Sequence, residues 1–501
     1  MQIEMKQRSL RNKYVICVSS LSATILLMGC ADVGEFDKTA DELVALMEKQ
    51  GAVVPMASGL VPSQLSSAAK LSAFVTSALQ SSPTVAAAQR RSMAAEARVT
   101  EANREFLPQV TISSDGTRTR QRVLKSSNPS LEGDDTKYST VNKTAVASLR
   151  LLDLPKSAKI AAAESEAKAR AADLDAAKQD LLRDILTSYF QSAEAIERWL
   201  LARAEVQSYQ TRLEFERTEA SVGELRSSDQ SVSAAELARA RSDVAVAAAD
   251  YRIRADRLCG ISYGGVCPYP SVASVGVPLP KPAPFSQGEL DNIENAPEIR
   301  AMAQRVNVAL REVDQARMAM APRMSLEVAA SERDRGGSLF DGSSLSRKDD
   351  ATLLFEWDIY TSGRLRAIRD AELNEALGAS HDYEAQLRSA VNDMRGATSA
   401  LAALWQHDRA LNRVISLRRL AKQEIERETK VGVSSIVDLA EARLELVRAE
   451  VLQQRTRRSY LAATVARARA TGDLDDSIVA IVERVVSDNR YSARVYGPVK
   501  Q

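Results

Sequence analysis

The stretch "SSPTVAAAQRRSMAAEARVTEANREFLPQV", residues 81–110, has a second copy in "NAPEIRAMAQRVNVALREVDQARMAMAPRM", residues 295–324. Prolines stand at matching places, 214 residues apart (297 − 83 and 322 − 108): Pro83 with Pro297, and Pro108 with Pro322. Because proline is favoured in the first turn of a helix and stops helices elsewhere, each copy predicts one helix bounded by prolines. The equal offset over a whole helix indicates an internal two-fold sequence repeat.

A pair of strands is predicted after each of these helices. "MSLEVAAS" from Met324 and "ATLLFEWDIY" from Ala351 alternate apolar and polar residues, and "VTISSDGTRTR" and "AVASLRLLDL" repeat this more weakly in the first half. The polar segments between the strands, "VLKSSNPSLEGDDTK" and "RGGSLFDGSSLSRKDD", are predicted to be loops. Such strands suit the wall of a membrane barrel, and a half-buried sheet of a soluble protein gives the same alternation.

Two very long helices follow the strand pairs. Residues 156–220 contain no glycine or proline and would extend about 100 Å, and residues 364–430 are interrupted only by Gly378 and Gly396. Apolar residues three or four positions apart form a seam along the second helix, which indicates coiled-coil packing. The seam consists of Leu365, Ile368, Ala376, Ala379, Tyr383, Leu387, Val391 and Met394.

A Val-Gly pair ends each long helix, and an aspartate stands six residues after each glycine (229 − 223 and 438 − 432). Glycine at this position is a common helix stop, and a second helix is predicted to return from each turn. Each half of the chain is therefore predicted to have the same order of elements: a helix, a strand pair, a long helix, a turn and a second helix. The tip residues are Val222, Gly223 and Asp229 in the first half, and Val431, Gly432 and Asp438 in the second.

The composition favours long packed helices and argues against a nucleic-acid partner. Of 501 residues, 45% are hydrophobic and only 5% aromatic. Lys and Arg number 67 against 66 for Asp and Glu, so there is no overall basic excess that would attract nucleic acid. His381 and His407 are the two histidines, and neither has companion ligands or a nucleophile nearby in the sequence. We therefore expect no metal site, no cofactor and no enzymatic activity.

The first thirty residues predict export. Basic residues in "MQIEMKQRSLRNK" precede the apolar run "YVICVSSLSATILLMG", the layout of a signal peptide, which we assign to residues 1–29. The run ends in "LLMGC", which resembles the bacterial lipobox, so we expect Cys30 to be lipidated and to become the first mature residue. An ordinary cleaved signal with an incidental cysteine is the alternative.

The remaining cysteines form an even pair. Of four cysteines, Cys17 lies in the signal and Cys30 would carry lipid, which leaves Cys259 and Cys267 in "LCGISYGGVCP". The oxidising periplasm permits a disulfide between them, which would close a glycine-rich surface loop. Since no histidine or further cysteine is close in sequence, a metal site is not expected there.

The order of these elements resembles that of the TolC family of outer-membrane efflux proteins over residues 70–475. The "FLP" helix end, the "FEWDIYTSGRLRA" join and the tips "VGVSSIVD" and "VGELRSSD" carry the resemblance. It implies a mainly α-helical homotrimer in which each protomer gives four strands to one twelve-stranded β-barrel in the bacterial outer membrane. The long helices would continue the barrel as a coiled-coil tunnel through the periplasm.

The resemblance also implies a function and partners. Such proteins are passive exit ducts that dock on a periplasmic adaptor and an inner-membrane pump, either proton-driven (RND type) or ATP-driven (ABC type). They export small molecules or, in type I secretion, unfolded proteins. A periplasmic coiled-coil lipoprotein that anchors other proteins without a pore is the rival hypothesis.

The resemblance assigns roles to the tips. Val222, Gly223, Val431 and Gly432 would form the turns on which the adaptor docks, and Asp438 and Glu441, with Asp229 in the first tip, would line the aperture. A capping box at Ser435 explains Asp438 equally well. Relatives lock the closed aperture with an aromatic residue and a basic residue at the positions of Thr429 and Ser434, so a different lock is expected here.

These expectations divide the chain into six segments. They are the signal peptide (1–29), a lipid-anchored segment (30–70), the first efflux repeat (71–258), a linker with the cysteine pair (259–287), the second efflux repeat (288–475) and a C-terminal tail (476–501).

Overall fold

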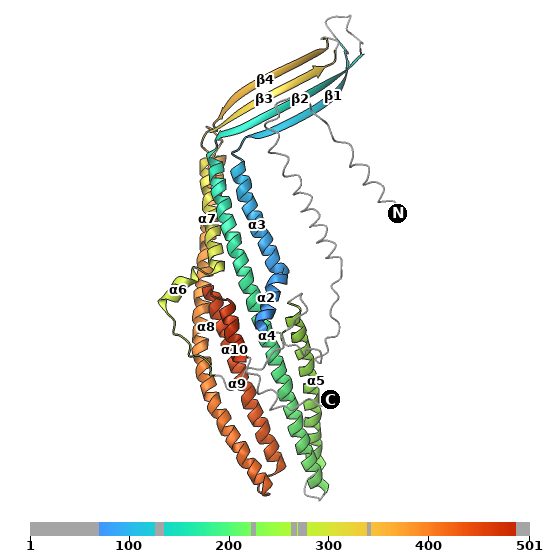
Figure 1. Ribbon diagram of the computed structural model, residues 1–501, viewed down its shortest axis with the longest axis vertical. Helices are drawn as coiled ribbons and strands as arrows, with labels where there is room; N and C mark the ends of the chain where they lie inside the picture. The colour runs from blue at the N-terminus through green and yellow to red at the C-terminus, as the bar shows by residue number, and fades with distance from the viewer. Residues whose placement is uncertain are drawn as a thin grey trace. The chain divides into compact units, whose positions relative to one another are not determined.

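The computed structural model describes residues 70–125, 135–221, 227–261, 268, 278–337 and 342–486, all within the compact unit Ala68–Gln501. The predictions for the signal peptide, Cys30, Val222, Gly223 and Cys267 lie outside the described residues. Figure 1 shows the elements. Their bounds are α2 Leu71–Ser81, α3 Pro83–Arg104, β1 Gln109–Arg122, β2 Asp135–Leu152, α4 Leu154–Ser221, α5 Ser227–Cys259, α6 Gln287–Ile293, α7 Pro297–Met318, β3 Arg323–Arg335, β4 Ser344–Glu356, α8 Arg364–Lys430, α9 Ile436–Thr471 and α10 Asp476–Val486.

The prolines begin the helices that the sequence predicts. Helices α3 and α7 each have 22 residues and start at Pro83 and Pro297. Proline suits this position because the first amide of a helix has no partner within the helix. Ser82 also caps α3 by accepting a hydrogen bond from the Val85 amide at 3.5 Å. The same order of elements, a helix, a strand pair and two further helices, then occurs in each half.

Helices α4 and α8 are continuous over 68 and 67 residues, as the long stretches with little glycine and no internal proline predict. The seam predicted for α8 is largely confirmed. Leu365, Ala376 and Met394 are buried, and every other seam residue except Ile368 is half-buried. Gly378 and Gly396 lie inside α8 without breaking it, and α8 packs along its length against α7 and α9.

The four strands form one antiparallel sheet in the order β1-β2-β3-β4. The central pair joins the two halves of the chain, with Ala145 opposite Ala330, and one register shift falls between Arg150 and Leu152. The strands extend further than the sequence predicts: Ser344–Asp350 belongs to β4 and Asp135–Lys137 to β2, where loops were expected. Backbone pairing is indifferent to side-chain polarity, and most of these side chains are exposed.

Helix α4 contacts α2, α3, α5, α7 and α9, so it packs against elements of both halves. Figure 1 shows α5 running back beside α4, and α9 beside α8, as two antiparallel hairpins. Helix α7 lies between α4 and α8. Among the described residues, no helix is long and apolar enough to cross a membrane.

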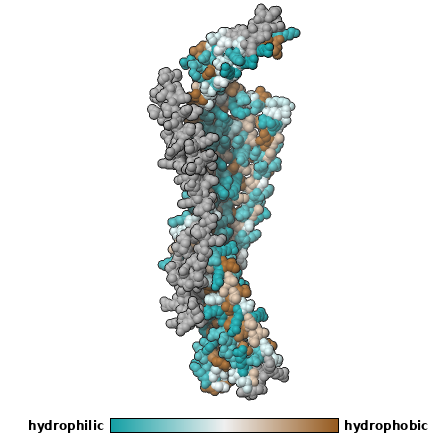
Figure 2. All heavy atoms as spheres, turned by 90° about the vertical axis from the view of Figure 1, so that its right-hand side faces the viewer, coloured by the Kyte–Doolittle hydropathy of each residue, from teal (hydrophilic) through white to brown (hydrophobic). Residues whose placement is uncertain are grey.

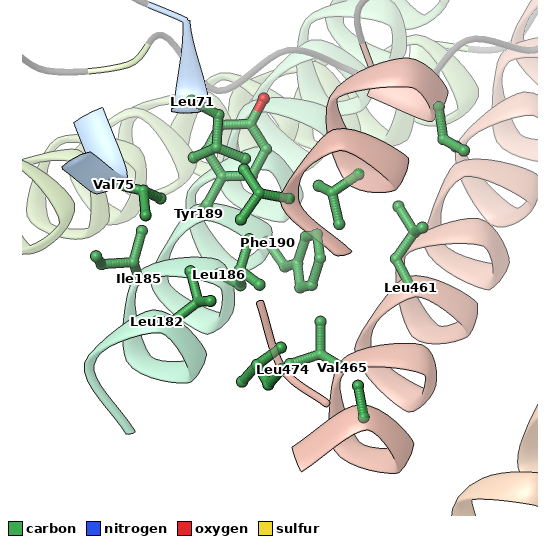
Figure 3. Packing of buried hydrophobic residues seen from close by; sticks show 14 of the residues in the cluster. Leu71, Val75, Leu182, Ile185, Leu186, Tyr189, Phe190, Leu461, Val465 and Leu474 are labelled. Carbon is green, nitrogen blue, oxygen red and sulfur yellow. The ribbon is translucent and has the colours of Figure 1, made fainter. Parts of the chain in front are cut away.

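The largest apolar core lies where α2, α4, α9 and α10 meet (Figure 3). Phe74, Ile185, Leu186 and Leu461 are at most 1% exposed there. Burying such side chains stabilises the fold by about 1.5–3 kcal/mol each. Smaller apolar clusters surround Met394 and Ile196, and buried polar pairs lie between the helices as well.

The pair Arg457 and Asp408 is the clearest of these buried polar contacts. Arg457 of α9 donates to Asp408 of α8 at 2.7 Å, and both side chains are less than 5% exposed. Asn412 donates to Asp408 and accepts a hydrogen bond from Gln453, which extends the network along the α8–α9 contact. Since an unpaired buried charge costs about 3–5 kcal/mol, this network favours one alignment of the two helices.

Gly472 ends α9 where space is limiting. Its φ of 77° is left-handed, and its carbonyl accepts a hydrogen bond from Gln179 at 2.5 Å. A Cβ atom built on Gly472 would lie 2.8 Å from the Cα of Ala296, immediately before α7. Only glycine satisfies both the backbone conformation and the close approach.

We predict that Gly472→Ala lowers the free energy of unfolding by about 2–5 kcal/mol. About 1–2 kcal/mol comes from the left-handed backbone and about 1–3 kcal/mol from overpacking. Gly432→Ala is the matched control, because Gly432 has a φ of 79° but nothing within 4 Å of its Cβ position. Guanidinium unfolding of the detergent-solubilised protein measures both, and equal losses would contradict the packing argument.

Candidate functional site

The tip of the α8–α9 hairpin is closed by a turn that Gly432 makes possible. The Val433 amide donates to the Glu428 carbonyl at 2.9 Å, and the Gly432 amide donates to the Thr429 carbonyl at 3.2 Å. With Gly432 in the left-handed region, these bonds form a Schellman motif, which satisfies carbonyls that the helix end leaves open. Val431 and Val433 are about three-quarters exposed at the end of the turn.

A capping box begins α9. The Asp438 amide donates to the Ser435 hydroxyl at 3.0 Å, and the Asp438 carboxylate accepts from the Ser435 amide at 2.9 Å and from its hydroxyl at 2.8 Å. The hydrogen bond from the hydroxyl, followed by that from the amide, holds the pKa of Asp438 below its usual value. Asp438 is nevertheless exposed, so it is an ionised cap that also faces solvent.

Thr429 and Ser434, the positions of the relatives' lock, stabilise the tip internally. The Thr429 hydroxyl donates to the Ile425 carbonyl at 2.7 Å, within its own helix. The Ser434 hydroxyl donates to the Glu428 carboxylate at 2.6 Å, across the turn. Within one chain, Ser434 therefore ties the turn before α9 to the end of α8, while the Thr429 bond stays within α8.

Glu441 lies one turn after Asp438, exposed on α9 and close to α4. The pKa of Arg212 on α4 is raised above its usual value, first by its hydrogen bond with Glu216 and, less strongly, by Glu236 and Glu441. Arg212 donates to Glu216 at 2.9 Å. The charge of Glu441 is thus partly balanced across the contact between the two hairpins.

The other predicted site residues are only partly described. Asp229 lies in the first turn of α5, and the structure gives its backbone but not its side chain. Cys259 ends α5 and is disulfide-bonded. Its expected partner, Cys267, lies outside the described residues, so that pairing stays a prediction. His381 and His407 are both exposed on α8.

The sequence alone did not reveal a row of ion pairs between α9 and α4. Arg448 contacts Glu205 at 2.9 Å, Arg458 contacts Glu197, and Arg469 contacts Asp180 at 3.1 Å. We call these three pairs the α4–α9 seam. The arginines are ten and eleven residues apart (458 − 448 and 469 − 458), close to three helical turns, so they share one face of α9. That spacing was the signal available in the sequence.

Glu197 is the titratable group at the middle of this seam. Burial raises its pKa from 4.5 to about 7, although Arg458 opposes the shift. Neither carboxylate oxygen of Glu197 has a well-directed hydrogen bond among the described residues. Because the folded chain binds this proton more tightly than the unfolded chain, the contribution of Glu197 to stability falls as the pH rises from 4.5 to about 7.

Known proteins share both the sequence pattern and the fold. A family model described as outer membrane efflux protein matches residues 74–261 and 291–473. The chain is similar to the pyoverdine export outer membrane protein OpmQ of Pseudomonas putida, with 26% identity over 421 residues, covering 80% of this chain and 86% of OpmQ.

Two solved channels have the same fold. The CmeC outer membrane channel of Campylobacter jejuni matches with a TM-score of 0.68 and 18% identity over 84% of this chain and 89% of CmeC. The open state of the MtrE outer membrane channel of Neisseria gonorrhoeae matches with a TM-score of 0.64 and 21% identity over 81% of this chain and 90% of MtrE. Since the family model takes in both halves, the chain belongs to the outer membrane efflux protein family, whose members are passive outer-membrane channels and not enzymes.

Proposed function

We propose that three copies of this chain form the exit duct of a tripartite export system, with one twelve-stranded barrel continued by a helical tunnel. The main support for this proposal is that the sheet has two long, unpaired edge strands. Strands β1 and β4, of 14 and 13 residues, are the edge strands of a four-stranded sheet. Long open edges are not tolerated in a bilayer, and a ring of copies would pair each β4 with a neighbouring β1.

The apolar face of the sheet supports a membrane position for the strands. Val110, Ile112, Leu353 and Phe355 are each at least 60% exposed. Such a surface is a liability in water and fits a lipid-facing wall. A coiled-coil scaffold, the rival function, would gain nothing from this sheet, so the duct is the better supported hypothesis.

We propose a small molecule as the cargo, delivered through a periplasmic adaptor and an inner-membrane pump. The similarity to OpmQ, a pyoverdine export protein, supports a small molecule over an unfolded protein. Both pump types, proton-driven and ATP-driven, and type I secretion stay compatible with this duct. Lipidation of Cys30 after removal of residues 1–29, a Cys259–Cys267 disulfide and a duplicated origin of the two halves belong to the same proposal.

The duct itself is tested with the purified protein. We expect trimers that resist dissociation in detergent and change migration on heating, and discrete conductance steps in planar bilayers. Discrete conductance separates a channel from a scaffold, because a scaffold of the same helices forms no pore. Monomers without channel activity would overturn the proposal.

The tip turn is the proposed docking site of the adaptor, since it ends the exposed hairpin. Gly432→Leu should reduce export by at least tenfold with intact trimers, because leucine disfavours the left-handed backbone of the turn and its side chain obstructs the docking surface. Gly378→Leu is the matched control: Gly378 is exposed on α8, with nothing within 4 Å of its Cβ position. Export is measured with the cognate adaptor and pump, and normal export by Gly432→Leu would refute tip docking.

In the trimer, Asp438 and Glu441 of three protomers would ring the aperture, with Asp229 contributing from the first tip. Like charges about 6 Å apart repel by roughly 3 kcal/mol at an effective dielectric near 20, and Arg212 would relieve part of this repulsion. A ring of carboxylates favours cations in the pore.

We therefore predict that Asp438→Asn with Glu441→Gln abolishes cation selectivity in planar-bilayer recordings at low salt, where screening is weak. Ser435→Ala is the control, because it breaks the capping box without changing the charge. It should cost about 1 kcal/mol of stability and leave the selectivity intact. If Ser435→Ala alone removes the selectivity, the aspartate acts as a helix cap and not as part of a charged ring.

A further inference from the structure

The segment that joins the two halves of the chain lies along helix α9. Residues 278–286, "PLPKPAPFS", contain no helix or strand, and prolines occupy every second position from Pro278 to Pro284. Each proline fixes one backbone angle at about −65°, so the segment is stiff and loses little conformational freedom when it is held in place. We call residues 278–286 the proline strap.

Side chains of α9 hold the proline strap. The Tyr460 hydroxyl donates a hydrogen bond to the Pro280 carbonyl at 2.8 Å. Arg467, about two turns further along α9 (467 − 460), donates to the Ala283 carbonyl at 3.0 Å. Leu279 is 6% exposed and belongs to the same apolar core as Tyr460. The strap is therefore fixed to α9 at two levels and to the core at one.

The end of the proline strap meets α8 next to a glycine. The Arg395 guanidinium lies over the Phe285 ring, 5.8 Å from its centre, in a cation–π contact. The following residue, Gly396, is in the interior of α8, and nothing lies within 4 Å of the position that its Cβ would take. The close approach that explains Gly472 does not explain Gly396. A glycine inside a helix weakens it and makes it easier to bend.

A cleft beside Gly396 leaves room for such a bend. Its volume is about 570 Å³. Alanines of α8 and α9 form much of its wall, among them Ala397, Ala400, Ala463 and Ala466. Small side chains interlock less than large ones, so a tilt of one helix against the other at this level displaces few packed atoms.

The ion pairs between α9 and α4 become more exposed toward the tips. Arg458 and Glu197, at the level of the proline strap, are 8% and 2% exposed. Arg448 and Glu205, nearer the tips, are 44% and 25% exposed. Exposed pairs contribute little to stability, and Figure 2 shows hydrophilic residues over much of the surface toward the tips. The α8–α9 hairpin is thus held firmly at the strap and more loosely beyond it.

We propose that the proline strap and Gly396 form a hinge, about which the α8–α9 hairpin swings as a lever when the aperture opens. The proposal rests on the proposed function, which puts the aperture at the tips. The strap keeps α9 and α8 in place at this level, and Gly396 lets α8 bend there. From Gly396 to Lys430 the lever has 34 residues (430 − 396), about 51 Å, so a bend of about 10° moves the tip by about 9 Å.

The first test compares two alanine substitutions in α8 of the full-length trimer. Gly396→Ala should stiffen the hinge and reduce, at least fivefold, the fraction of time that single channels are open in planar bilayers with the cognate adaptor. Gly378→Ala is the matched control, because it gives α8 the same gain in helix propensity away from the hinge and also has nothing within 4 Å of its Cβ position. It should leave the open fraction unchanged. Equal effects, or no effect of Gly396→Ala, overturn the proposal.

The second test measures where α8 moves. Gln386 and Gln406 are both exposed and lie ten residues on either side of Gly396 (396 − 386 and 406 − 396). With a spin label on a cysteine at one of these positions, adaptor docking should change the distance between protomers by about 3 Å or more at Gln406 and by less than about 1 Å at Gln386. Equal changes at both positions in conducting trimers overturn the hinge and leave the duct standing. A wild type without trimers or conductance overturns both.

The strap itself is tested with the variant Pro280→Ala, Pro282→Ala, Pro284→Ala, which restores freedom to the backbone of the segment. The label at Gln386 should then move with the one at Gln406, because the level of the strap is no longer fixed. Lys281→Ala, an exposed position of the same segment, is the control and should behave as the wild type. A proline variant whose two labels move as in the wild type overturns the role of the strap.

Discussion

Helix α4 packs against helices from both halves of the chain, and the rest of the helical structure depends on these contacts. A helix of 68 residues has no stable existence alone in water, and here it packs against α2, α3, α5, α7 and α9. The largest apolar cluster among the described residues surrounds Ile185 and Leu186, and smaller ones surround Met394 and Ile196. Over the remaining length, small side chains and ion pairs keep the helices together.

The elements could be predicted from sequence wherever a local signal marks their ends. Pro83 and Pro297 begin helices, and Gly432 ends one, because these residues act through their own backbone geometry. The capping role of Asp438 could be predicted for the same reason, because a capping box depends on residues only three positions apart. Strand ends were less predictable, since Ser344 to Asp350 pair in the sheet although their side chains are those of a loop.

What the sequence did not disclose depends on contacts between distant residues. Arg212 and Glu441 interact although 229 positions separate them (441 − 212). Glu197 stands among many carboxylates of α4, and only its burial against Arg458 sets it apart. Thr429 and Ser434 could be identified as departures from the relatives, but their replacement contacts, inside the hairpin, required coordinates.

The spacing of the α4–α9 seam has a mechanical consequence. Three arginines on one face of α9 contact three carboxylates of α4, spread over most of the length of α9. A rigid slide of α9 along α4 by one helical turn, about 5.4 Å, would strain all three pairs together. The seam therefore opposes sliding of the α8–α9 hairpin along α4, because such a movement has to disturb three ion pairs and not one.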